Sequence, residues 1–371
     1  MTQERCPGSW CEIHRDRISN NLKLALGLVP KGRGFCAVLK ADAYGHGIQQ
    51  VVPLIQTQGV TCIGITSNAE GYAVRSAGFT GTLIRVRAAT PPEIEDAIDA
   101  QVEEQVGSLE VAQTLQRLKT AGRPVPCHLA LNALGMSRDG LEISTDQGRA
   151  TCLSILEMLA EDIVGICTHF PCNTPQNLRM ASKLFQQQVA WIIDNSTLDR
   201  SDILVHAGSS LTLVADEPVE TDMYRCGAIL YGILKPELGF QTTMDLKARV
   251  VSLGDYPKGA TVGYDGAHRL RSDRQLACVS IGYANGFRRD LQDDAAVAIG
   301  TQIAPVLGKV SMNTVVVDAT DLDGVQVGDE ATVFGETGGA RTSLGATEQQ
   351  FRTIMADLYS DWGLRNPRVF R

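Results

Sequence analysis

Eight short runs of apolar and β-branched residues recur along the first two thirds of the chain, with amphipathic stretches between them. The runs are FCAVLK (35–40), TCIGIT (61–66), GTLIRV (81–86), EEQVGS (103–108), PCHLALN (126–132), IVGICTHF (163–170), DILVHAGSS (202–210) and CGAILYG (226–232). The intervening segments carry apolar residues at helical spacing. Strands that alternate with helices form parallel βαβ units, and eight such units close into a barrel. The pattern therefore predicts an α/β fold with a (β/α)8 barrel of TIM type over residues 13–238.

The pattern of apolar and polar residues changes from about residue 240. Short alternating runs such as DLKARVVSL (245–253), QLACVSIGYA (275–284) and EATVFG (330–335) replace the long helical stretches. Such alternation is typical of antiparallel strands. We therefore predict a C-terminal β-rich domain over residues 239–371, joined by an N-terminal strand at residues 8–12. One closing helix is expected over QQFRTIMADLYSDWG (349–363).

The charge balance restricts the partners of the chain. Thirty-four Lys and Arg residues against 42 Asp and Glu residues give a net charge of -8, which argues against a nucleic-acid partner. No apolar run is long enough for a membrane span, so no membrane partner is expected. The first dozen residues contain no apolar leader, which predicts a cytoplasmic location, with periplasmic export as the alternative if a leader was removed.

Ten cysteines are present, without paired CxxC motifs or zinc-ligand spacing. Cys36 and Cys62 fall at similar depths in two successive predicted strands. If those strands are neighbours, the two residues lie within the range of a disulfide, and a bond and a buried thiol pair are both open.

The segment AVLKADAYGHG (37–47) is the most informative one for chemistry. A buried strand ends in Lys40, and a Gly-rich polar loop follows. The carboxyl ends of barrel strands form the active face, so this lysine is expected to point at substrate. An isolated lysine there is more often a side chain that extends to water. Lysine is also the residue that forms Schiff bases with pyridoxal 5'-phosphate.

The string K-A-D-A-Y-G-H-G resembles the signature of the alanine racemase family around its cofactor lysine, and the resemblance extends over essentially the whole chain. It implies a barrel, a C-terminal β domain and a homodimer with shared active sites. Pyridoxal 5'-phosphate would be the cofactor and an amino acid the substrate. Lys40 would hold the cofactor and act as one of two catalytic bases, and Tyr44 would contact the cofactor phosphate.

The second base of that family is a tyrosine that the partner subunit contributes, and it matches Tyr264 in TVGYDGAH (261–268). Racemisation needs two bases, because a planar carbanion at Cα can be reprotonated from either face and each face requires its own proton carrier.

The resemblance also implies roles for residues in later motifs. Arg225 would donate a hydrogen bond to the pyridine nitrogen, and His169 would link this arginine to the catalytic tyrosine. Arg138 would contact the phenolic oxygen of the cofactor and the substrate carboxylate. Further contacts are implied to the phosphate by Ser210, Gly227 and Ala228, and to the substrate or its entrance by Met312 and Tyr283. No metal site is expected.

Three positions depart from typical alanine racemases. Leu131 stands where many members carry a lysine, Asn313 where the typical residue is aspartate, and Leu364 where a tyrosine narrows the pocket. With the strings KVSMNT and YPKG, they resemble the broad-specificity amino-acid racemase branch, which accepts larger side chains such as lysine, arginine and methionine as well as alanine. Cys36 and Cys62 match positions that are bridged in that branch.

The leading interpretation is thus a pyridoxal-phosphate-dependent amino-acid racemase, an isomerase of broad specificity. A dedicated alanine racemase is the first alternative. A barrel-type amino-acid decarboxylase with the same cofactor and a non-enzymatic cofactor carrier are the others. The presence of Tyr264 and of residues 240–371 argues against both.

Overall fold

The computed structural model describes residues 6–337 and 340–371; residues 1–5, part of the segment searched for a leader, lie outside it. The chain divides into two compact units. One comprises Ser19–Ala43 and Ile48–Phe240, and the other Met1–Ile18, Tyr44–Gly47 and Gln241–Arg371. Helices α1 (Arg15–Leu28) and α2 (Lys40–Tyr44) each contain a boundary between the units.

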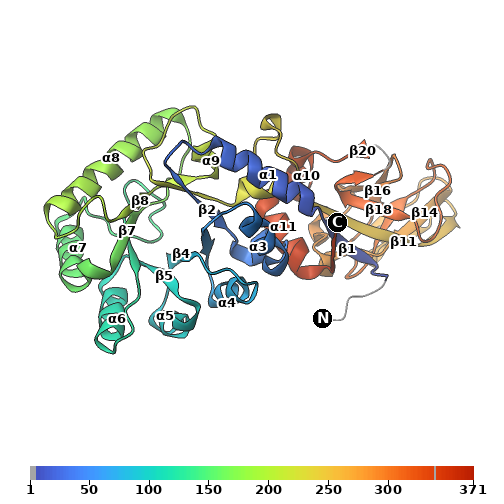
Figure 1. Cartoon of the computed structure of the whole chain (residues 1–371). Coiled ribbons are helices and arrows are strands. Elements are labelled where there is room, and N and C mark those ends of the chain that lie inside the picture. The colour runs from blue at the N-terminus through green and yellow to red at the C-terminus, as the bar shows by residue number, and fades with distance from the viewer. Residues whose placement is uncertain (1–5, 338–339) are drawn as a thin grey trace. The chain divides into compact units, whose positions relative to one another are not determined.

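The first unit is built on a parallel sheet (Figure 1). Within the described residues its order is β8-β7-β6-β5-β4-β3-β2-β10-β9. The strands are β2 (Gly34–Val38), β3 (Cys62–Ile65), β4 (Thr82–Ala88), β5 (Val102–Val106), β6 (Cys127–Ala130), β7 (Ile163–Cys167), β8 (Leu204–His206), β9 (Gly208–Ser209) and β10 (Met223–Cys226). Only Ala207 separates β8 from β9, and these strands pair with β7 and β10 respectively. The sheet therefore closes on itself as a barrel.

Helices follow the strands and lie around them in Figure 1. They are α3 (Ile48–Thr57), α4 (Asn68–Ser76), α5 (Pro91–Asp96), α6 (Leu109–Thr120), α7 (Asp146–Leu159), α8 (Pro175–Asp194) and the short α9 (Ser210–Leu213). Side-chain caps define several of their starts. Ser108 accepts a hydrogen bond from the N–H of Val111, and Thr145 accepts one from Gly148. Apolar side chains of α6, α7 and α8 form one buried cluster with those of β6 and β7.

The predicted strand over residues 226–232 is wrong. The strand is β10, which ends at Cys226, and Ala228–Tyr231 forms a 3-10 turn. The N–H groups of Gly227 and Ile229 donate to Ser210 Oγ, so they are withdrawn from the sheet.

The second unit contains an antiparallel sheet in which β11 (Met244–Tyr256) pairs with β18 (Glu330–Phe334) through its first half and with β14 (Arg274–Val279) through its second. The order β14-β17-β16-β15-β18-β11 therefore closes a small barrel, and β1 (Ser9–Ile13) and β21 (Arg368–Phe370) extend it beside β11. The remaining strands are β12 (Thr261–Val262), β13 (His268–Arg269), β15 (Ala296–Ile299), β16 (Gln302–Leu307), β17 (Val315–Asp318), β19 (Glu336–Thr337) and β20 (Ala340–Arg341).

The closing helix predicted over residues 349–363 is two helices. α10 (Leu344–Phe351) ends where Arg352 adopts a left-handed conformation with φ of 53°, and α11 (Met355–Arg365) begins after Ile354. Trp362 of α11 is fully buried, and its ring packs edge-on against Phe351 with centroids 5.5 Å apart.

Cys36 and Cys62 are direct neighbours on β2 and β3, as the similar depth of the two runs predicted. Both are free thiols in this structure and both are buried. A hydrogen bond to Cys36 and burial raise the pKa of the Cys62 thiol. Among the described residues, no helix is both long and apolar enough to cross a bilayer.

Candidate active site

Lys40 follows β2 at the carboxyl end of the barrel, and its side chain reaches solvent there. Partial desolvation and the positive charge of Arg138 lower the pKa of Lys40, whereas the carboxylate of Glu70 acts in the opposite direction. A lysine with a lowered pKa is more often neutral, and the neutral amine is the nucleophile and the base.

The backbone after Lys40 forms a left-handed turn. Ala41, Asp42, Ala43 and Tyr44 have φ values of 53°, 52°, 59° and 53°. Each non-glycine residue in this region costs about 1–2 kcal/mol, so the turn requires support from its surroundings. Two carboxylates supply it.

Glu70 Oε1 accepts a hydrogen bond from the N–H of Ala41 at 2.7 Å, and Asp42 Oδ1 accepts one from Ile48 at 2.8 Å. The second oxygen of Glu70 accepts from the backbone of Thr66 and Ser67. Glu70 therefore fixes the position of Lys40, and it is a site residue that the sequence reasoning missed. The Ser67-x-x-Glu70 capping box was the signal for it.

Arg225 is the last residue but one of β10 and is 9% exposed. Its NH1 donates to His206 Nδ1 at 2.7 Å and to the His206 carbonyl at 2.8 Å, and its NH2 donates to the Thr168 carbonyl at 2.7 Å. These bonds use three of the five N–H donors of the guanidinium and leave donors for a ligand.

His169 lies just after β7, in the same group of charges. Desolvation, followed by the positive charges of Arg225, Arg138 and Lys40, lowers the pKa of His169 to about 4. The imidazole is therefore neutral near pH 7, although it still reaches solvent. The charges of Lys40, Arg138 and Arg225 thus all act on the imidazole of His169.

Ser210 is buried at the start of α9, and its Oγ accepts hydrogen bonds from the N–H groups of Gly227 at 3.1 Å and Ile229 at 3.4 Å. Ala228 begins the adjacent 3-10 turn. Because both N–H groups donate to this oxygen, the Ser210 O–H remains as a donor suited to a phosphate. With the amine of Lys40 and the cation of Arg225, the barrel carries the functional groups that pyridoxal 5'-phosphate requires.

Arg138 lies on the loop after β6, is 54% exposed, and its Nε is 3.5 Å from Asp139 Oδ2. The Asn132 side chain organises this loop. It accepts a hydrogen bond from the N–H of Ser137 at 2.9 Å and donates to Glu142 at 2.6 Å.

Tyr264 lies in the second unit, 58% exposed, in a short turn after Gly263. Gly263 has a φ of 78°, and a Cβ there would be 2.6 Å from the backbone nitrogen of Lys309. The Lys309 ammonium also pairs with Asp265 at 2.6 Å. The turn that carries Tyr264 is therefore held against residues 308–309.

Tyr283 and Met312 lie together in the same unit. The N–H of Tyr283 donates to the Ser311 carbonyl at 3.1 Å, and the N–H of Ala284 donates to the Met312 carbonyl at 2.9 Å. The guanidinium of Arg289 lies over the rings of both Tyr264 and Tyr283. The sequence reasoning missed Arg289, which no motif marks.

Tyr44 belongs to the second unit and is buried. Its carbonyl accepts a hydrogen bond from His46 Nδ1 at 2.9 Å.

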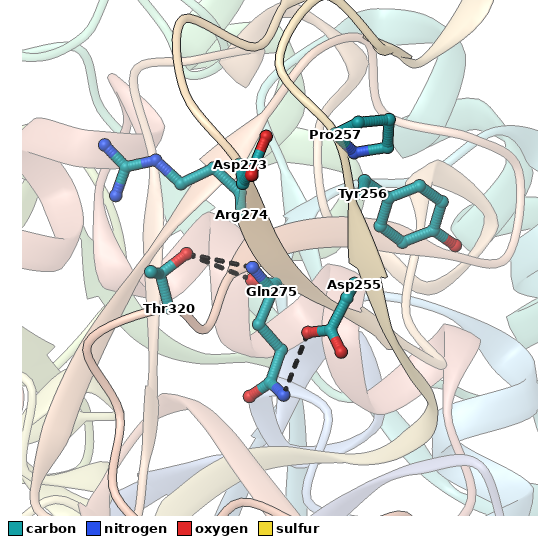
Figure 2. Close-up of a pocket in the computed structure, with 7 residues that line it drawn as sticks. All are labelled: Asp255, Tyr256, Pro257, Asp273, Arg274, Gln275 and Thr320. Atoms are coloured by element: carbon teal, nitrogen blue, oxygen red, sulfur yellow. Dashed lines mark hydrogen bonds between the residues drawn. The ribbon is translucent and has the colours of Figure 1, made fainter.

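A surface hollow near the ends of β11 and β14 contains none of the residues selected from the sequence (Figure 2). Gln275 lines this hollow. Its side-chain amide donates a hydrogen bond to Asp255 at 3.4 Å, and its backbone N–H donates one to Thr320 Oγ1 at 3.0 Å. Gln275 thus connects Asp255 with Thr320 across the hollow.

Comparison with known proteins places the chain in a family. Residues 13–235 match the model described as alanine racemase, N-terminal domain, and residues 243–370 match that described as alanine racemase, C-terminal domain. A broad specificity amino-acid racemase of Aeromonas hydrophila is 40% identical over 366 residues, which cover 98% of this chain and 90% of that protein. A lysine racemase of Proteus mirabilis is 37% identical, over 97% of this chain and 89% of that one.

The solved structures agree on the fold. An alanine racemase from Bartonella henselae, with covalently bound pyridoxal phosphate, superposes with a TM-score of 0.85 at 21% identity, over 98% of this chain and 99% of that one. The comparisons confirm the resemblance, the fold class, the racemase class of enzyme and the cofactor. The chain belongs to the alanine racemase family of pyridoxal-phosphate-dependent amino-acid racemases.

Proposed function

We propose that this enzyme interconverts L- and D-amino acids with Lys40 as one base and Tyr264 of the partner subunit as the other. The observation that carries the proposal is the position of Lys40 just after β2, at the start of a left-handed turn that Glu70 and Asp42 hold, where its pKa is lowered. A neutral amine at that position can take a proton from Cα, and a phenol on the opposite face can return one.

Several of the residues named from the sequence would hold the cofactor. Lys40 would attach it covalently, Ser210 with the N–H groups of Gly227 and Ala228 would bind the phosphate, and Tyr44 would add a phenol. When bound, pyridoxal phosphate withdraws electrons from Cα and so makes its proton acidic.

Arg225 would face the pyridine nitrogen. A guanidinium is a permanent cation that can only donate, so it disfavours a proton on that nitrogen. Arg225 would in this way keep a bound ring a weaker electron sink, which would favour the return of a proton to Cα. This arrangement favours racemisation over transamination.

Arg138 would bind the substrate carboxylate through its exposed guanidinium, with the backbone N–H of Met312 as a second donor. Tyr283 would lie at the entrance. His169 is neutral near pH 7, because its pKa is about 4, and it would link Arg225 to the phenol of Tyr264 as an uncharged hydrogen-bonding group.

We further propose that the pocket accepts side chains larger than that of alanine, lysine and arginine among them. Leu131, Asn313 and Leu364 replace residues that are typical of alanine racemases, and the names of the Aeromonas and Proteus relatives point in the same direction. A site with fewer steric walls discriminates weakly between side chains.

A homodimer is part of this proposal, because Tyr264 would act in the active site of the partner. Mixing inactive Lys40→Ala and Tyr264→Phe subunits tests it. Hybrid dimers would contain one site with both bases and regain activity, whereas a mixture that stays inactive would contradict the shared site.

The first experiment is a screen of L-Ala, L-Ser, L-Lys, L-Arg and L-Met for conversion to the D-enantiomer by the enzyme with pyridoxal phosphate. Turnover of several is expected, and turnover of alanine alone would identify a dedicated alanine racemase. The Lys40→Ala variant should lose both activity and the covalent link to the cofactor, which mass spectrometry after borohydride reduction detects. Release of carbon dioxide without racemisation would instead indicate a decarboxylase.

A further inference from the structure

A chain of buried hydrogen bonds runs from Arg225 across four strands of the barrel. His206 Nδ1 is 2.7 Å from NH1 of Arg225, His206 Nε2 is 3.0 Å from His128 Nδ1, and His128 Nε2 is 2.9 Å from Glu103 Oε2. We infer that Glu103, His128 and His206 are positioning residues that fix the orientation of Arg225 toward the cofactor ring.

The donors in this series of hydrogen bonds determine which ring nitrogen of His206 and of His128 carries the proton. A guanidinium only donates, so His206 Nδ1 must be an acceptor and its proton must be on Nε2. That N–H donates to His128, whose Nδ1 is therefore also an acceptor. The remaining His128 Nε2–H donates to the Glu103 carboxylate. All three hydrogen bonds therefore point the same way, from the guanidinium of Arg225 through two neutral imidazoles to the carboxylate of Glu103.

The side chains in this hydrogen-bond series are largely buried, so their positions are restricted by the surrounding packing. His206 is completely buried, His128 is 1% exposed, and the Glu103 side chain is 23% exposed. The two rings meet edge to face, with centroids 4.9 Å apart and planes at 87°. Gly165 on β7 leaves the space for this contact, because a Cβ there would collide with His128 Nδ1. The backbone carbonyls of His206 and Thr168 accept hydrogen bonds from two more N–H groups of the Arg225 guanidinium.

The charge of Glu103 matters because buried cations need a counterion. Arg225 makes no ion pair with a carboxylate among the described residues. Aligned hydrogen bonds polarise one another, so the anion at the far end of the chain favours the cation at the near end. Without Glu103, the guanidinium would be held less firmly against the pyridine nitrogen. This step rests on the proposed role of Arg225.

Nitrogen NMR of the whole enzyme with 15N-labelled histidine tests this series of hydrogen bonds directly. The protein has six histidines, and the variants His128→Gln and His206→Gln assign the two signals. The imidazoles of His128 and His206 should both be neutral at pH 7.5, with the ring proton on Nε2. A proton on Nδ1 of either ring would overturn the inference, whatever the enzyme catalyses.

The consequence for the cofactor is tested with Glu103→Gln and Glu103→Leu. Glutamine can still accept from His128 and loses only the charge, whereas leucine also loses the acceptor. We expect the ratio of racemisation to transamination to fall roughly tenfold in Glu103→Leu, as for the loss of one charge-assisted hydrogen bond, and less in Glu103→Gln. The control is Glu95→Gln, which removes a carboxylate from an exposed surface pair with Arg117.

The outcomes separate the two proposals. An unchanged ratio in folded Glu103→Leu, with circular dichroism like that of the wild type, would refute the positioning role and leave racemase function intact. Absence of racemisation in the wild type would refute the proposed function, and the NMR result on the chain would still stand.

Discussion

Arg289 holds the ring of Tyr264 from one side: its guanidinium carbon lies 5.7 Å from the centroid of that ring. The same carbon lies 5.6 Å from the centroid of Tyr283. A cation over an exposed aromatic ring contributes about 0.5–1 kcal/mol, which is enough to restrict a side chain that is 58% exposed. One arginine therefore orients both the proposed second base and the proposed entrance residue.

Replacement of Arg289 by methionine should slow the proton transfer that Tyr264 performs. Because the Lys40 step does not depend on this arginine, Cα hydrogen exchange in D2O should fall more from one enantiomer than from the other, by about threefold to fivefold, the equivalent of one cation–π contact. NMR of each enantiomer measures the two rates. Arg352→Met, which breaks an exposed pair with Asp294, is the control. Equal slowing from both enantiomers would contradict the role.

Glu70→Gln should shift the pH dependence of covalent cofactor attachment. The Glu70 carboxylate raises the pKa of Lys40, so its removal lowers that pKa further. Attachment needs the neutral amine, and its pH midpoint should therefore move to lower pH. Absorbance titration with pyridoxal phosphate follows the midpoint. Glutamine keeps one oxygen that can accept from Ala41, whereas Glu70→Ala loses all these bonds and should in addition destabilise the fold by about 1–3 kcal/mol. A midpoint that moves to higher pH would contradict the prediction that the Glu70 carboxylate raises the pKa of Lys40.

The alternation of strands and helices was sufficient to predict the barrel, because parallel βαβ units leave few alternatives. The prediction failed where local bonding overrode propensity. The apolar string after Cys226 has the composition of a strand, but Ser210 Oγ takes the N–H groups of Gly227 and Ile229 out of the sheet. The break between α10 and α11 was missed because Arg352, and not a glycine, adopts the left-handed conformation at the end of the helix.

A buried ion pair offers a test of barrel stability. Arg85 and Glu104 are 0% and 1% exposed, and they form two hydrogen bonds of 2.7 and 2.9 Å. Arg85→Met leaves Glu104 buried without its cation and should destabilise the protein by about 3–5 kcal/mol. Adding Glu104→Leu should restore much of the loss, since no uncompensated charge remains. Urea unfolding at pH 7.5 compares the variants. A double variant as unstable as Arg85→Met would exclude this explanation.

Acid should destabilise the protein through His206. Burial, followed by the charges of Arg225 and His128, lowers the pKa of His206 well below its usual 6.5. The unfolded chain takes up a proton below about pH 6.5 and the folded chain does not, so stability is complete above that pH and falls as the pH decreases. The slope is at most about 1.4 kcal/mol per pH unit for one histidine. Unfolding of wild type and His206→Asn from pH 7.5 to 5 should show a shallower slope in the variant, and equal slopes would contradict this assignment.

The candidate site was only partly visible in the sequence. Lys40, Arg138, Arg225 and Tyr264 stand in motifs, so each could be named from neighbouring residues. Glu103, His128 and His206 come from three strands that lie far apart in the sequence. Only the strand register brings them together, with His128 opposite Gly165 on β7 and His206 opposite Cys167. No local pattern carries that information.

Leu364→Tyr should narrow the range of substrates. Leu364 is 69% exposed on α11, so a tyrosine meets little packing resistance there and the fold should be unaffected. The proposed function places this residue where alanine racemases have a tyrosine that narrows the pocket. The ratio of kcat/KM for lysine to that for alanine should therefore fall roughly tenfold, because steric exclusion acts on the longer side chain first. Leu364→Met, of similar volume, should leave the ratio unchanged. Equal losses for both substrates would mean that position 364 does not determine which side chains the enzyme accepts.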